Sequence, residues 1–141
     1  MSDDFDLQRF VAAQDKGEIY DRALDELRRG RKQSHWMWYV FPQIAGLGSS
    51  QMADKYAISS LAEATAYVAH PVLGPRLVAA AKELTAIDSH DPVQVVGAVD
   101  SLKLRSSMTL FERAAPQEPV FGQVLEQYYG GRRDDATLDR L

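Results

Sequence analysis

The sequence predicts an all-α fold: a compact single domain of about six or seven helices with one extended aromatic segment. Most segments repeat apolar residues with a helical period. Capping residues and prolines recur where those segments begin, and glycines recur where they end. The 141 residues, of which 45% are apolar and 26% charged, suit one globular domain with its own core.

Apolar stripes place the helices in order along the chain. They are expected at about 7–14, 20–27, 60–69, 75–84, 91–97, 100–115 and 119–129. Ser60 and Glu63 form a capping-box pattern, whereas Gly74 fits an N-cap that precedes Pro75 in a first turn. Asp91 and Asp100 are expected to cap the helices at 91–97 and 100–115, and the second helix carries an apolar stripe of Leu104, Met108, Phe111 and Ala115.

The stretch HWMWYVF, residues 35–41, lacks a helical period and is predicted to be extended. Trp36, Trp38 and Val40 would then face one side. Pro42 favours extended geometry at the preceding Phe41. Because no partner strand is evident, the backbone groups of this segment would need partners from neighbouring helices or water.

Composition limits the class of protein. We expect a single helical domain over 1–141, with an ordered core at roughly 5–131 and a loosely held polar tail at 132–141. The absence of cysteine excludes thiol nucleophiles, disulfides and cysteine-bound metals, and it fits the cytoplasm. The N-terminus has no signal-peptide pattern, and no apolar run approaches the roughly 20 residues of a membrane span.

The net charge of −4 argues against a nucleic-acid partner, because a phosphate backbone would be repelled. One basic run, RRGRK at 28–32, stands out. We interpret it as the end of a helix, where cations oppose the negative end of the helix dipole.

Four blocks of sequence occur in an order that resembles a known family. They are HWMWYVFPQIAGLGSS, KYAI, HPVLGPRL and LKLRSSMTLF. The chain is similar over almost its whole length to a family of bacterial and fungal proteins called domain of unknown function 1810. The resemblance implies a compact, mainly helical single domain and carries over no catalytic residue, cofactor or substrate. Some similar proteins are labelled calpastatin, but this compact, unrepeated chain does not suggest protease inhibition.

The aromatic residues at 36–41 allow two interpretations. Trp36, Trp38 and Tyr39 form either one wall of a binding pocket or part of a solid core. Polar His35 and Gln43 flank them, and a buried indole N–H needs a hydrogen-bond partner. The sequence alone leaves both interpretations open.

The GLGSS run that follows could hold an anion. Gly46 and Gly48 permit close backbone approach, and Ser49 or Ser50 could cap a helix that begins at residue 51. The free N–H groups of that helix could bind a phosphate or carboxylate. A plain turn into a helix is the alternative, and the run matches neither a P-loop nor a dinucleotide fingerprint.

His35 is the candidate general acid or base, because imidazole suits proton transfer near neutral pH. A histidine hydrogen-bonded at the core edge is the alternative. We expect His70 to form structural hydrogen bonds at a bend and His90 to be solvated. The three histidines lack metal-ligand spacing, so no metal is expected.

The block DSLKLRSSMTLF, residues 100–111, is the second candidate region. Lys103, Arg105, Ser106 and Ser107 could form an anion-binding edge beside an apolar stripe. The serines could instead serve small-residue packing or bond back to the preceding turn.

These candidates together favour a protein that binds an anionic, nucleotide-like small molecule in an aromatic-lined pocket. The ligand set would be Trp36, Trp38, Tyr39, Gln43, Gly46, Gly48, Ser49, Lys103, Arg105, Ser106 and Ser107, with His35 as the catalytic candidate. The alternative is a protein-interaction module without a small-molecule ligand, and a third interpretation makes both regions pure core. The sequence implies no cofactor and leaves catalysis and the physiological partner undetermined.

Overall fold

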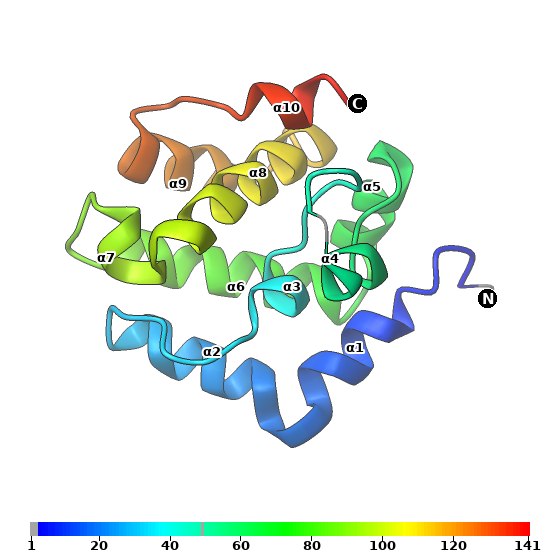
Figure 1. Ribbon diagram of the computed structural model, residues 1–141, viewed down its shortest axis with the longest axis horizontal. Coiled ribbons are helices and arrows are strands. Elements are labelled where there is room, and N and C mark those ends of the chain that lie inside the picture. Colours follow the sequence, from blue (N-terminus) through cyan, green and yellow to red (C-terminus); the bar gives the residue numbers. More distant parts are fainter. Residues whose placement is uncertain (1–2, 49) are drawn as a thin grey trace.

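A computed structural model describes residues 3–48 and 50–141 of the chain (Figure 1). The all-α prediction is confirmed, because these residues form ten α-helices and a single 3₁₀ turn. The longer helices are α1 (Gln8–Asp15), α2 (Ile19–Arg28), α5 (Leu61–Ala69), α6 (Leu73–Ala86), α8 (Ala98–Ala114) and α9 (Val120–Tyr129). The shorter elements are η1 (Lys16–Glu18), α3 (Met37–Val40), α4 (Gln51–Lys55), α7 (Pro92–Val96) and α10 (Asp135–Leu138). None of the helices in the described ranges is long and apolar enough to cross a membrane.

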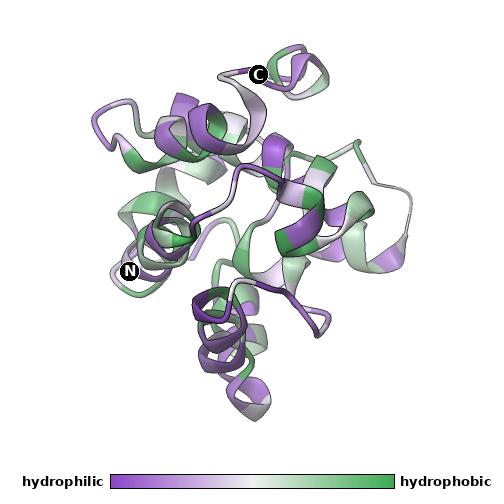
Figure 2. Cartoon of the chain, turned by 90° about the vertical axis from the view of Figure 1, so that its left-hand side faces the viewer, coloured by the Kyte–Doolittle hydropathy of each residue, from purple (hydrophilic) through white to green (hydrophobic). Residues whose placement is uncertain are grey.

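Helix α8 organises the packing. It contacts α5, α7, α9 and α10, while α6 contacts α2, α5 and α9. In Figure 1, α1 and α2 lie on one side of α6, and α8, α9 and α10 lie on the other. Leu104, Met108 and Phe111 of the predicted α8 stripe are all buried. Figure 2 shows apolar and polar positions sharing the same helices, as expected when each helix buries one face.

Two predicted helix starts are confirmed by their caps. The Ser60 hydroxyl accepts a hydrogen bond of 3.1 Å from the Glu63 amide, which caps α5. The Asp91 carboxylate accepts from the Val93 amide at 3.0 Å and caps α7. These side chains satisfy backbone N–H groups that the first turn leaves without helical partners.

The α5–α6 connection differs from the prediction. Gly74 is the second residue of α6 rather than its N-cap. A Cβ atom at this position would lie 2.0 Å from the carbonyl oxygen of Val68, so only glycine lets the two helices approach this closely. The ring nitrogen Nδ1 of His70 accepts hydrogen bonds from the amides of Val72 and Leu73, which confirms its predicted structural role.

The predicted extended geometry of the aromatic segment is wrong for residues 37–40, which form the helical turn α3. No sheet is available there, so local bonds satisfy the backbone instead: the amide of Val40 donates to the Trp36 carbonyl at 3.2 Å. The chain leaves the helix at Phe41, and Ile44 then forms an isolated parallel bridge with Ile58. The loop after α4 therefore supplies the backbone partners that the sequence did not reveal.

The C-terminal residues include the short helix α10, which contacts α8. Asp134 caps α10, and its carboxylate accepts hydrogen bonds from the hydroxyls of Ser106 and Thr137. Thr137 is fully buried, and α10 packs on α8. Polar composition did not reveal this capped turn, and how loosely residues 132–141 are held stays a prediction.

Candidate functional site

The loop between α2 and α3 is anchored by one buried carboxylate. Glu26 of α2 accepts hydrogen bonds from the amides of Gln33 and Ser34, from the Ser34 hydroxyl, and from Trp36 Nε1 at 2.8 Å. Burial would raise the pKa of Glu26, but these hydrogen bonds outweigh that effect and lower it to about 2. Trp36 is consequently fixed in the core at 1% exposure, not exposed as a stacking surface for a ligand.

Two lysines lie over the two tryptophans, with an aspartate between them. Lys32 Nζ is 5.2 Å from the Trp36 ring centroid, and Lys103 Nζ is 5.1 Å from that of Trp38. The carboxylate of Asp100 lies 2.8 Å from the ammonium of Lys32 and 3.8 Å from that of Lys103. These contacts place the helix near residue 103 against the aromatic segment, as the pocket hypothesis requires.

A groove of about 440 Å³ opens beside this network. We call it the Trp38 groove. It is lined by Lys32, His35, Met37 and Trp38 on one side, and by residues 96–100 with Lys103 on the other. Its apolar surface comes from Met37, Trp38 and the valines at 96 and 99. Its charged end comes from the ammonium groups of Lys32 and Lys103 and the carboxylate of Asp100.

The N-terminus of α8 forms part of the groove. Helix α8 begins at Ala98. Its N-cap is Gly97, which has no side chain to cap the first turn. The predicted cap, Asp100, lies instead in the first turn, where its carboxylate is available to the lysines. Amide groups of a first turn lack helical partners and carry partial positive charge, so this end of the groove combines that positive charge with the Asp100 carboxylate.

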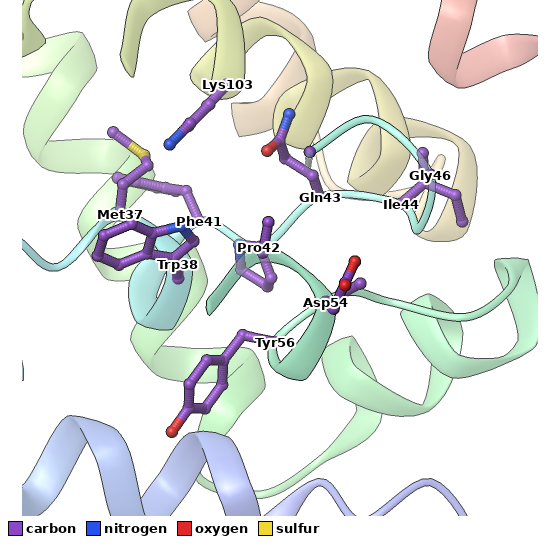
Figure 3. A pocket seen from close by; sticks show the side chains of 13 residues that line it. Met37, Trp38, Phe41, Pro42, Gln43, Ile44, Gly46, Asp54, Tyr56 and Lys103 are labelled. Carbon is purple, nitrogen blue, oxygen red and sulfur yellow. The ribbon is translucent and has the colours of Figure 1, made fainter. Parts of the chain in front are cut away.

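A second, much smaller cavity lies behind Trp38 (Figure 3). Its volume is about 10 Å³, which is room for about one water molecule. Gln43, Gly46 and Gly48 line this cavity together with Trp38 and Lys103, and none of these three lines the groove. The remaining candidate of this run, Ser49, lies outside the described residues.

The indole N–H of Trp38 is oriented differently from that of Trp36. Its Nε1 is buried and has no hydrogen-bond partner in the described ranges. In Figure 3 the side chain of Lys103 descends from α8 toward the Trp38 ring. Of the three aromatic residues predicted to form a pocket wall, Trp38 is thus the one that lines both the groove and the small cavity.

Tyr39 faces away from the groove. Its ring makes an edge contact with Tyr56 at 4.9 Å between centroids, and burial raises its pKa. Its backbone carbonyl accepts a hydrogen bond from Gln14 of α1. Tyr39 therefore belongs to the packing between α1 and α3, and its assignment to the ligand wall is not supported.

The predicted anion-binding edge on α8 does not come together. Arg105 forms an ion pair of 3.3 Å with Asp134, and Ser106 donates to the same carboxylate at 3.1 Å. Ser107 is fully buried in the core. Residues two apart on a helix point about 200° away from each other, so Lys103 reaches the groove while Arg105 faces α10.

His35 is exposed and lines the Trp38 groove, as the candidate role requires. His70 accepts hydrogen bonds from the amides of Val72 and Leu73 at the start of α6, and the ring nitrogen Nδ1 of His90 donates a hydrogen bond of 3.0 Å to the carbonyl oxygen of Gln127. Across residues 3–48 and 50–141, no group of three histidine, aspartate or glutamate side chains is arranged to hold a metal ion.

Sequence reasoning missed three residues that shape the groove: Glu26, Lys32 and Asp100. Glu26 follows Ala23 by three residues, so it borders the apolar stripe of α2, and an acid in that position was a usable signal. Lys32 was interpreted only as part of a helix-terminal basic run. Asp100 was interpreted as a cap. The ion pair between Lys32 and Asp100 joins segments that are distant in sequence, and no local pattern reveals it.

Three comparisons with known proteins place the chain. A family model described as "Protein of unknown function (DUF1810)" matches residues 4–141. The crystal structure of the conserved hypothetical protein Rv1873 from Mycobacterium tuberculosis is similar, with 48% sequence identity and a TM-score of 0.95. The match covers 99% of this chain and 98% of that chain. A search of curated proteins returned no match.

Proposed function

The chain belongs to the DUF1810 family of proteins of unknown function, and we propose that it binds an anionic small molecule in the Trp38 groove. The observation that carries the proposal is the position of Lys103. Its ammonium lies 5.1 Å from the Trp38 ring centroid on the wall of a cavity of about 440 Å³. A cation, an aromatic ring and a helix N-terminus thus line one concave surface. The cation and the helix N-terminus favour an anion, and the ring favours an apolar body.

Lys103 is the cation best placed to meet a ligand. The side chain of Lys32 is only 8% exposed and is paired at 2.8 Å with Asp100. The side chain of Lys103 is 25% exposed, and its ion pair with Asp100 spans a longer 3.8 Å. An incoming anion therefore competes with a weak contact at Lys103 and a strong one at Lys32.

The other side of the ligand would rest on apolar surface. Trp38, Met37 and Val99 line the same groove. An aromatic or nucleotide-like ligand would bury its ring against these side chains, with its charge at Lys103 and the α8 amides. His35, on the same lining, is the residue through which proton transfer to the ligand would pass. The absence of cysteine keeps the cytoplasm as the proposed location.

A protein-interaction module is the second candidate, and one observation favours it. Val99 and Leu102, three residues apart on α8, are 67% and 65% exposed beside the groove. Two large apolar side chains on one helix face are a suitable contact for a partner protein. In this alternative the groove would accept a partner side chain, and small anions would not stabilise the fold.

A thermal-shift screen tests the proposal. Nucleotides, sugar phosphates, NAD derivatives and aromatic carboxylates would be screened against the unmodified chain, Trp38→Ala and Lys103→Met. A ligand present at about 100 times its Kd stabilises the fold by about 2.7 kcal/mol. We expect that shift in the unmodified chain and its loss in both variants.

Lys82→Met is the matched control, since it removes an exposed lysine of α6 outside the groove. It should retain the shift in full. A ligand that stabilises Lys103→Met as well as the unmodified chain would place the site elsewhere. Failure of every anion to stabilise the chain would favour the interaction module.

A further inference from the structure

The charged end of the Trp38 groove contains its own carboxylate. Asp100 Oδ2 lies 2.8 Å from Lys32 Nζ, and Oδ1 lies 3.8 Å from Lys103 Nζ. The side chains of Lys32 and Asp100 are only 8% and 18% exposed, so water screens their interaction poorly. One carboxylate thus offsets most of the charge of the more buried lysine.

The groove consequently presents one net positive charge. Among its charged side chains, Lys32 and Lys103 contribute two cations and Asp100 contributes one anion. A ligand with a single negative charge can pair with Lys103 without bringing excess charge near Asp100. A second negative charge on the ligand would find no free cation, because Lys32 is already paired with Asp100. The Asp100 carboxylate would repel it.

We infer that Asp100 determines ligand specificity by setting the net charge of the groove: the groove selects a singly charged anion on an apolar body, such as an aromatic carboxylate, over a doubly charged phosphate. The inference rests on the proposed function and narrows it to one charge class. The apolar lining from Met37, Trp38 and Val99 matches the body of such a ligand. The charged end, with Asp100 present, matches its single carboxylate.

Ligands that share one ring and differ in charge test the inference. Benzoate carries one negative charge, phenyl phosphate carries two at about pH 8, and benzamide carries none. Binding can be followed by the two indole N–H signals in a ¹⁵N-correlated NMR titration. The chain has two tryptophans, so Trp38 reports the groove and Trp36, held by Glu26, serves as an internal control.

Two variants change the charge in matched ways. Asp100→Asn raises the net charge of the groove by one. The double variant Lys32→Met/Asp100→Asn removes the buried pair and restores the original net charge. It also removes the unpaired buried lysine that could unfold the single variant.

We expect the unmodified chain to bind benzoate more tightly than phenyl phosphate or benzamide, with shifts at Trp38. Asp100→Asn should raise affinity for phenyl phosphate on the order of tenfold and affinity for benzoate much less. The double variant should return to the benzoate preference. If Asp100→Asn is unfolded, the order of affinities in the unmodified chain decides the inference, because tighter binding of phenyl phosphate there would overturn it.

Other results separate the two proposals. Tighter binding of phenyl phosphate by the unmodified chain, or an equal gain for both anions in Asp100→Asn, would overturn the role of Asp100 and leave anion binding intact. A double variant that prefers phenyl phosphate would overturn it as well. Absence of any Trp38 shift with either anion would overturn the proposed function and, with it, the inference.

Discussion

Trp36 donates a hydrogen bond of 2.8 Å from Nε1 to the Glu26 carboxylate, whereas Trp38, two residues later, has no such partner in the described residues. The two rings are close in sequence and differ in what their N–H groups do. One indole fixes the loop before α3 to α2. The other forms a wall shared by the groove and the small cavity.

The two tryptophans should therefore differ in their contribution to stability. Trp36→Phe removes a hydrogen bond to a buried charge, and such bonds contribute about 1.5–3 kcal/mol. Trp38→Phe removes an N–H that has no partner, so the two variants share the loss of ring volume and differ in the hydrogen bond. We expect Trp36→Phe to lower the free energy of unfolding by about 1.5 kcal/mol more, measured by urea denaturation and circular dichroism. Equal losses would show that the Glu26 contact contributes nothing.

Glu26 should be one of the most sensitive polar positions. Glu26→Gln keeps the shape and removes the charge that four hydrogen bonds stabilise, so we expect a loss of about 2–4 kcal/mol in unfolding free energy. Asp25→Asn is the control, because the exposed pair of Asp25 with Arg29 contributes at most about 1 kcal/mol. A variant Glu26→Gln as stable as that control would contradict the anchoring role.

The same carboxylate predicts a dependence on pH. The pKa of Glu26 is about 2 in the folded chain and 4.5 without the fold. A depressed folded pKa means that the stabilisation is complete above about 4.5 and is lost as pH falls toward 2. The stability difference between the unmodified chain and Glu26→Gln should therefore shrink across this window, as measured by denaturation at each pH. A difference that stays constant with pH would contradict it.

The sequence predicted much of the fold because helix signals are local. The Ser60 and Asp91 caps and the buried Leu104–Phe111 stripe follow from spacing alone. The aromatic segment failed for the opposite reason. Aromatic and β-branched residues without a helical period favour extended backbone, yet the absence of a partner strand favoured a helical turn at 37–40.

Only part of the candidate site could be predicted, because residue types are visible in the sequence whereas side-chain directions and distant contacts are not. Residue types identified Trp38, His35 and Lys103, which do meet at one groove. Arg105 and Ser106 do not reach this groove, because their side chains point from α8 toward Asp134 instead. Ion pairs between distant segments, such as Lys32 with Asp100, require tertiary structure, and a single sequence does not contain it in readable form.

The C-terminal turn offers a prediction about the tail. Asp134 accepts hydrogen bonds from Arg105, Ser106 and Thr137, and although burial would raise its pKa, those bonds lower it. Asp134→Ala should cost about 2 kcal/mol and speed hydrogen exchange in α10. Asp135→Ala, at an exposed neighbour, should change stability by no more than about 0.5 kcal/mol. Unchanged exchange in Asp134→Ala would show that this carboxylate does not hold α10 in place.

The close approach of α5 and α6 gives the last prediction. A Cβ at Gly74 would meet the Val68 carbonyl oxygen at 2.0 Å, and that oxygen belongs to the backbone of α5, so it cannot move alone. Gly74→Ala should cost about 3 kcal/mol in unfolding free energy. Gly122→Ala is the matched control within α9, where the new Cβ would meet the Glu112 carboxylate at 2.8 Å, a side-chain group that can shift together with its ion-pair partner Arg133. Because alanine favours a helix interior by about 1 kcal/mol over glycine, this control should cost little or nothing. Equal thermal stability of the two variants would show that the α5–α6 contact yields easily, and that Gly74 is not required for it.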